Sequence, residues 1–169
     1  LEGSLVIGHT RYKIQGGDTL DFAQPILVNS GKCEIAVGHN GNIEDLQLIK
    51  DRLAKKGLGQ LTPDYDSNYL AHVVAFAPGR SYIEKIQNGL RGVEGSYSLV
   101  IATGDGHLLG VRDPWANRPL SMVEQEGVWV IASETSAFQA IGATNRSKWH
   151  EFRPGEIVDI SAQGAFRSK

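Results

Sequence analysis

The sequence is poor in cysteine, because Cys33 is the single one among 169 residues. One cysteine excludes an internal disulfide, and no apolar run approaches the roughly 18 residues of a membrane-spanning helix. Lysine and arginine form no long run, and 17 basic against 19 acidic residues give a net charge of -2. We therefore expect a cytoplasmic protein with neither a membrane nor a nucleic-acid partner.

Methionine is equally scarce. The only one is Met122, and the sequence starts at Leu1 without the basic lead and long apolar core of a signal peptide. We expect the intact protein to extend upstream of Leu1. Because 41% of the residues are hydrophobic, the chain can bury a sizeable core without disulfides or metals, and we expect residues 1–169 to form a single domain.

The most informative stretch is residues 35–53, where the hydrophobic period changes. Residues 35–37 form a short apolar run that predicts a buried strand. After a polar interval, apolar residues recur at the spacing of a helix, at Ile43, Leu46, Ile49 and Leu53. The pattern predicts a strand, a polar corner and a helix.

The polar corner is His39-Asn40-Gly41-Asn42. Asn42 is a good helix N-cap, which would put Asn40 and Gly41 in the strand-to-helix turn. There a side-chain amide and a glycine N–H can point the same way, as an oxyanion hole for acyl transfer requires. The alternative is an ordinary hairpin turn, in which Asn-Gly is common.

The remaining pattern predicts strands at residues 4–8 and 26–29, helices starting at Asp66 and Ser81, and a short helix at residues 134–141. Further strands are predicted between residues 96 and 160, separated by glycine turns. Grouped strands, then helices, then more strands indicate an α+β protein with stacked layers rather than a βαβ series.

Four polar features are candidates for a site: Arg11, the Asn40-Gly41 corner, Asp66 and the Arg112-Asp113 pair. Arg11 can bind a carboxylate through two nitrogens, but beside Tyr12 it can equally be a structural residue. Asp66 is also an ordinary N-cap, and Arg112-Asp113 can be an ion pair that supports the turn at Pro114. The sequence has no zinc-binding spacing and no phosphate-binding loop. These residues alone indicate an acyl-transfer or amino-acid-binding site.

Several separated segments nevertheless match one family in order, and together they cover essentially the whole chain. The chain resembles the class II, N-terminal-nucleophile glutamine amidotransferase domain of amidophosphoribosyltransferases. The segments are GHTRY at 8–12, AQPILVNS at 23–30, GHNGN at 38–42, Asp66-Ser67, GSYS at 95–98, RDPWANRPL at 112–120, ASETSAF at 132–138 and RPGEIV at 153–158.

The resemblance implies a four-layer αββα sandwich that hydrolyses glutamine and supplies ammonia to phosphoribosyl pyrophosphate in purine biosynthesis. Arg11, with Tyr12 beside it, would bind the α-carboxylate of glutamine, and Asp66 its α-amino group. Asn40 and the Gly41 N–H would be the catalytic oxyanion donors. The resemblance implies no cofactor or metal in this domain. It implies a phosphoribosyltransferase domain or subunit as partner, which alone would bind Mg²⁺, and it allows the protein to form a homo-oligomer.

Departures from the family pattern keep two function classes open. The family nucleophile is an N-terminal cysteine in a segment before GHTRY. Leu1 cannot replace it, and Cys33 precedes the HNGN strand, where the family has no nucleophile. Ile14 stands where the family usually has threonine, and Asn68 where it commonly has glutamate. The chain is then either a fragment of a glutaminase, inactive without its cysteine, or a non-catalytic amino-acid-binding or scaffold module.

Overall fold

A computed structural model describes residues 3–10 and 20–168, which include two antiparallel sheets that lie face to face. The larger sheet has six strands, in the order β1-β2-β3-β4-β8-β9. These strands are β1 (Ile26–Asn29), β2 (Glu34–Ile43), β3 (Gly95–Thr103), β4 (Leu108–Arg112), β8 (Ile157–Ser161) and β9 (Gly164–Arg167). The smaller sheet has the order β6-β5-β7, with β5 (Ser121–Gln125), β6 (Val128–Ala132) and β7 (His150–Glu151).

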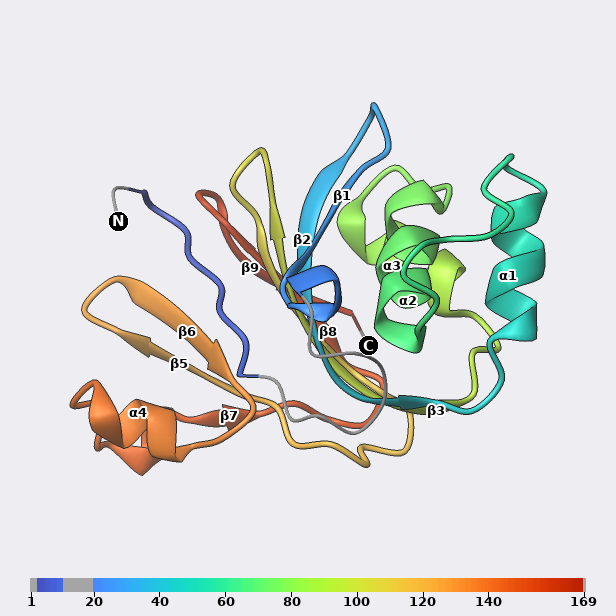
Figure 1. The fold of residues 1–169 in the computed structure, drawn as a ribbon. Helices are drawn as coiled ribbons and strands as arrows, with labels where there is room; N and C mark the ends of the chain where they lie inside the picture. The colour runs from blue at the N-terminus through green and yellow to red at the C-terminus, as the bar shows by residue number, and fades with distance from the viewer. Residues whose placement is uncertain (1–2, 11–19, 169) are drawn as a thin grey trace.

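Helices cover the outer face of each sheet (Figure 1). Three lie on one side of the larger sheet: α2 (Asp66–Phe76) and α3 (Tyr82–Leu90) pack against its strands, and α1 (Gln47–Ala54) packs against α2. The short α4 (Ser136–Ala140) lies on the outer side of the smaller sheet, and two 3-10 turns complete the elements, at Leu20–Phe22 and Arg146–Lys148. The layers are therefore helix, sheet, sheet and helix, which confirms the predicted αββα sandwich and α+β class.

The main core lies between the larger sheet and its three helices. Strand β2 supplies alternate side chains to it, because Ile35, Val37 and Ile43 are buried on the helix side. Helix α2 is buried along most of its length, and Leu70, Val73 and Val74 pack in the same cluster. Side chains of period two on the strand and of period 3.6 on the helix thus meet in one layer.

The predicted corner at residues 39–42 is wrong, because β2 continues through it. Residues Asn40, Gly41 and Asn42 pair in register with Ser98, Tyr97 and Ser96 of β3. Helix α1 begins only at Gln47, where Asp45 Oδ1 accepts the Gln47 N–H at 2.8 Å. Ladder pairing with β3 therefore outweighs the turn preference of Asn-Gly, and Asn42 is no helix cap.

The predictions for β1, α2 and α3 are confirmed. Strand β1 has the predicted bounds, and α3 begins after Ser81, whose side chain accepts the Glu84 N–H. Helix α2 starts at Asp66 as predicted, although Tyr65 rather than Asp66 is its N-cap residue. The predicted strand at residues 4–8 is not formed, and β7 was not expected.

Close packing across the two sheets yields a stability prediction at Gly110. A methyl group there would lie 2.6 Å from Phe152 Cε1 and closer still to Cζ, and Phe152 is only 1% exposed. Gly110→Ala should lower the free energy of unfolding by about 1–3 kcal/mol through overpacking. Gly59→Ala is the matched control, because nothing lies within 4 Å of its added methyl group. Equal stability of the two variants by denaturant unfolding would contradict the packing described.

Candidate functional site

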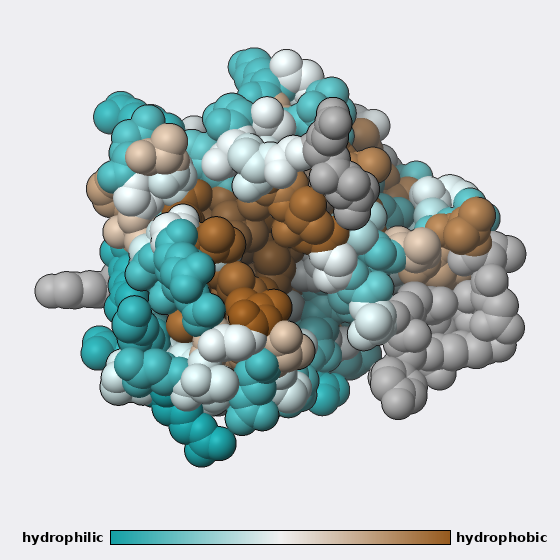
Figure 2. All heavy atoms as spheres, turned by 90° about the vertical axis from the view of Figure 1, so that its left-hand side faces the viewer, coloured by the Kyte–Doolittle hydropathy of each residue, from teal (hydrophilic) through white to brown (hydrophobic). Residues whose placement is uncertain are grey.

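A cavity of about 490 Å³ lies between the two sheets, next to the N-terminal segment. Its apolar walls include Leu5, Ile7 and Trp129, and Figure 2 shows apolar side chains gathered in a hollow on this side of the molecule. Asn40, His9 and Ser98 are polar members of the lining. Of the predicted site residues that the structure describes, only Asn40 lines this cavity.

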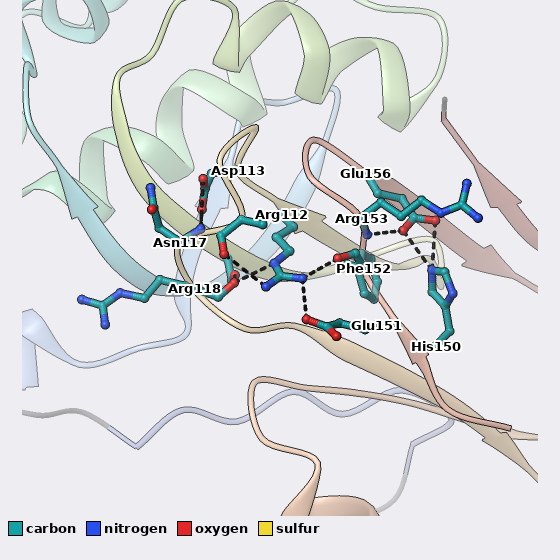
Figure 3. A network of polar contacts seen from close by, with 11 residues as sticks. Arg112, Asp113, Asn117, Arg118, His150, Glu151, Phe152, Arg153 and Glu156 are labelled. Atoms are coloured by element: carbon teal, nitrogen blue, oxygen red, sulfur yellow. Dashed lines mark hydrogen bonds and ion pairs between the residues drawn. The ribbon is translucent and has the colours of Figure 1, made fainter. Parts of the chain in front are cut away.

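The loop after β4 is held by two buried charged side chains, Arg112 and Asp113 (Figure 3). Arg112 donates to the carbonyl oxygens of Ala116, Arg118 and Phe152 and pairs with a carboxylate oxygen of Glu151 at 3.0 Å. Asp113 instead accepts backbone N–H groups, including those of Trp115 at 2.9 Å and Asn117 at 3.1 Å. The two side chains support the loop separately, so the predicted Arg112-Asp113 ion pair is wrong.

Asp113 also fixes the orientation of β3 opposite the HNGN segment. Its N–H donates to the Tyr97 carbonyl oxygen at 2.9 Å, and its Oδ2 accepts the Tyr97 N–H at 3.3 Å. In an antiparallel pair, opposed residues either exchange both hydrogen bonds or exchange none. Since both backbone groups of Tyr97 bond Asp113, its partner Gly41 must turn its own N–H away from β3. Burial, with Asp113 adding to it, raises the pKa of Tyr97 to about 12.

The N–H groups of His39, Gly41 and Ile43 therefore point to the flank of β2 opposite β3. Strand β1 covers this flank only as far as Val37. Beyond it, Gln24 Oε1 accepts the His39 N–H at 2.6 Å, and Asp66 Oδ2 accepts the Ile43 N–H at 3.3 Å. Within residues 3–10 and 20–168, no acceptor meets the N–H of Gly41. Among the described residues, this group therefore has no partner, whereas its neighbours at His39 and Ile43 have one each.

Gly41 is also a position at which only glycine fits. Its φ is +153°, and a Cβ would collide with the Ser96 carbonyl group and lie 2.9 Å from His39 Nε2. The backbone at this point therefore leaves no room for a side chain. A donor of this kind suits a developing negative oxygen.

Asp66 lies on the same flank as the Gly41 N–H. Its Oδ1 accepts the Ser67 N–H at 2.7 Å and is 3.3 Å from Ser67 Oγ, which donates to it. Because β-strands rise about 3.4 Å per residue, the Ile43 N–H that bonds Asp66 lies about 7 Å along β2 from that of Gly41. That spacing suits a ligand with a carbonyl at one end and an ammonium group at the other.

His39 connects these groups from the helix side of β2. Its side chain is 3% exposed, and its Nδ1 lies 2.8 Å from Ser67 Oγ. On the flank itself, His9 Nε2 donates to the His39 carbonyl oxygen at 3.1 Å. Burial lowers the pKa of His39, and the nearby carboxylate of Asp66 opposes this effect only in part. The imidazole is therefore held in its neutral form.

Sequence reasoning assigned no role to three residues that organise this flank, namely Gln24, His39 and Ser67. All three belong to segments that carry the family resemblance. The signal that could have found His39 is its place in the alternation of Ile35 and Val37. Arg11 and Tyr12 lie outside the described residues, so their predicted contacts and the convergence of Arg11, Asn40, Gly41 and Asp66 on one pocket stay predictions.

Cys33 is buried in the turn between β1 and β2. Burial raises the pKa of its thiol above the ordinary value, which disfavours the reactive thiolate. Asn40 follows Cys33 by seven residues, which corresponds to about 23 Å at the rise of a β-strand.

Neither a membrane-spanning helix nor a metal-binding cluster is found in the described part of the chain. No helix there has the length and apolar character needed to cross a bilayer. Likewise, no three or more His, Cys, Asp and Glu side chains within residues 3–10 and 20–168 come together as metal ligands.

The chain belongs to the glutamine amidotransferase domain family, whose model matches residues 9–140. Similar curated proteins are amidophosphoribosyltransferases: the mouse (Mus musculus) enzyme is 34% identical over 185 residues, and that of Synechococcus elongatus 36% identical over 171. The alignments cover 96% and 97% of this chain but only 35% and 34% of those proteins. The chain thus spans about a third of the length of these relatives.

Solved structures agree with this assignment. The glutamine phosphoribosylpyrophosphate amidotransferase of Bacillus subtilis, in complex with ADP and GMP, superposes with a TM-score of 0.79 and 29% identity, over 95% of this chain and 34% of that one. A structure described as the allosteric regulatory enzyme of purine biosynthesis gives 0.82, also at 29% identity, with 95% and 34% of the two chains covered. A class II glutamine aminotransferase domain protein from Silicibacter pomeroyi is 16% identical, with a TM-score of 0.57 over 80% of this chain and 67% of that one, and shows the shared fold only.

The buried imidazole yields a pH prediction. Because the folded state lowers the pKa of His39, the unfolded state takes up the proton first as the pH falls through the ordinary histidine value of about 6.5. The free energy of unfolding should therefore fall between about pH 7 and pH 5, and His39→Asn should make this dependence shallower. Denaturant unfolding at several pH values tests this. A variant whose stability falls as steeply as that of the parent would speak against a neutral buried His39.

Proposed function

We propose that this chain is the glutamine-hydrolysing domain of an amidophosphoribosyltransferase-like protein. The observation that carries the proposal is the N–H of Gly41, which lacks an acceptor among the described residues between Asn40 and Asp66, in a chain of the glutamine amidotransferase family. The flank of β2 offers a donor for the amide oxygen and a carboxylate for the α-amino group. Few other small molecules need both at this separation.

In the proposed reaction, glutamine lies along the flank with its amide at Asn40 and Gly41. Asp66 binds the α-amino group, and Arg11 with Tyr12 binds the α-carboxylate. Support for Arg11 comes from its position two residues after His9, whose Nε2 donates to the His39 carbonyl oxygen on this flank. A cysteine thiolate from a segment before Leu1 would attack the amide carbon. The oxygen then gains negative charge, which the Asn40 amide and the Gly41 N–H stabilise. The C–N bond breaks as the nitrogen takes up the proton that the thiol gave to the N-terminal amine, ammonia leaves, and water hydrolyses the remaining thioester to glutamate.

The wider role proposed for the intact protein follows its relatives. Ammonia would pass to phosphoribosyl pyrophosphate in a partner phosphoribosyltransferase domain or subunit, which would also hold Mg²⁺, whereas the present domain uses no cofactor. Under this proposal the intact protein is a cytoplasmic transferase of purine biosynthesis that forms a homo-oligomer, and the present chain is one of its domains.

The second candidate is a non-catalytic amino-acid-binding or scaffold module. Ile14 favours it, since a branched apolar side chain removes a hydroxyl from the expected glutamine pocket. Asn68 favours it less, because its Nδ2 donates to the Pro63 carbonyl oxygen at 2.8 Å and the residue is buried. Asn68 thus supports the loop before α2, a role that is independent of glutamine.

Asp66→Asn tests the proposed ammonium site. The variant keeps the shape of the side chain and loses its charge, so glutamine affinity should fall about tenfold or more, as expected for a lost charge-assisted bond. Asp64→Asn is the matched control, because its exposed carboxylate pairs with Lys50 at 3.1 Å on the surface. Titration calorimetry with L-glutamine measures both. The ammonium assignment fails if the two variants bind alike.

A further prediction concerns the nucleophile. The polypeptide that begins at Leu1 should release no ammonia from glutamine above a protein-free control, because oxyanion stabilisation without a nucleophile gives little acceleration. Cys33→Ala should change neither ammonia release nor glutamine binding, since this thiol is buried and distant from Asn40. Extending the polypeptide by its native upstream segment, which this proposal expects to begin with the nucleophilic cysteine, should restore release. Ammonia release that disappears in Cys33→Ala would instead make Cys33 the nucleophile.

A further inference from the structure

His39 stands out on β2 because it is a polar side chain on an apolar face. Ile35, Val37 and Ile43 occupy the same face, and all are buried against the helices. A branched apolar residue would satisfy this environment better than an imidazole, since burying a polar ring costs free energy unless it is hydrogen-bonded. A polar ring at this position therefore needs a hydrogen-bond partner, and Ser67 on α2 provides one for Nδ1.

The two nitrogens of His39 face the two halves of the proposed glutamine site. Nδ1 lies 2.8 Å from Ser67 Oγ, and Ser67 bonds Asp66 Oδ1 through both its N–H and its hydroxyl. On the other side of the ring, Nε2 packs under Gly41, within 2.9 Å of the point that a Cβ would occupy. One buried ring thus contacts both Gly41, whose N–H is the proposed oxyanion donor, and the helix start that carries the carboxylate.

We propose that His39 is a positioning residue that sets the separation between the Asp66 carboxylate and the Gly41 N–H. It does so by holding the first turn of α2 against β2 through Ser67, and it contacts no substrate atom itself. The inference rests on the proposed function, because that separation matters only if one ligand bridges the two groups. Asp66 bonds Ile43 at the end of β2, so His39 and Ile43 hold the start of the helix at two points.

A pair of nearly isosteric variants separates positioning from simple packing. His39→Asn keeps a polar atom close to the place of Nδ1, whereas His39→Leu fills a similar volume without one. The Leu variant should bind L-glutamine about tenfold more weakly than the parent, and the Asn variant within about threefold of it. Both should lose similar stability in denaturant unfolding. A residue that only fills space would give the two variants equal affinities.

Ser67 offers an independent route to the same hydrogen bond. Ser67→Ala should weaken glutamine binding about as much as His39→Leu, and the double variant should be little worse than either, because both changes remove one interaction. His72→Asn is the control, since His72 Nδ1 bonds the Asn68 carbonyl within α2, away from β2. Additive losses in the double variant would overturn the proposal. If His39→Leu does not fold, the glutamine affinities of Ser67→Ala and His39→Asn are compared instead.

A readout without glutamine keeps this inference separate from the proposed function. The amide NMR signals of Gly41 and Ile43 should shift in Ser67→Ala, which removes the hydrogen bond but keeps the His39 ring, and stay near the parent positions in His72→Asn. If the parent chain does not bind glutamine, the proposed function fails while these shifts still test the positioning role. Signals that do not move in Ser67→Ala would overturn the role of His39 alone.

Discussion

A buried backbone N–H group that has no neighbouring strand to pair with needs another acceptor. This requirement determines the structure around the second half of β2. Strand β2 runs to Ile43, whereas β1 covers it only to Val37. Gln24 and Asp66 replace the missing strand at His39 and Ile43, and the N–H between them meets no acceptor in the described part of the chain. Because β2 is longer than its neighbour β1, the unpaired part of β2 forms the edge at which we propose that a ligand binds.

The register that creates this edge depends on residues far from it in the sequence. Asp113 takes both backbone groups of Tyr97, which obliges Gly41 to face the other way. Arg112 holds the loop that contains the other partners of Asp113, so two buried charges at the end of β4 determine the direction of one N–H on β2. Supporting residues of this kind are as necessary to the site as the groups that would touch a ligand.

The sequence predicts the elements whose ends carry strong local signals. Helix α3 has Ser81 and Glu84 at its start, and Pro78-Gly79 follows α2, so both helices were predicted. The HNGN corner was misjudged because Asn-Gly is a turn signal by itself, while the pairing partner that overrides it lies more than fifty residues away. Strand β7 has only two residues and no period to detect. Asn40, Gly41 and Asp66 were found through chemistry and resemblance, whereas Gln24, His39 and Ser67 act through contacts that only the fold creates.

Asp66 would have two roles in the proposed site, because it would bind the α-amino group of glutamine and already connects the end of β2 to the start of α2. The two roles conflict only if no acceptor position of the carboxylate is left for the amino group. An ionised carboxylate offers about four lone-pair sites, and Asp66 accepts three donors, from the Ile43 N–H and from the N–H and hydroxyl of Ser67. With respect to the described residues, one site therefore stays open to an ammonium group. If the Ser67 hydroxyl turns its proton to His39 Nδ1 instead, a second site opens, so an incoming amine can be accommodated without breaking the contact between strand and helix.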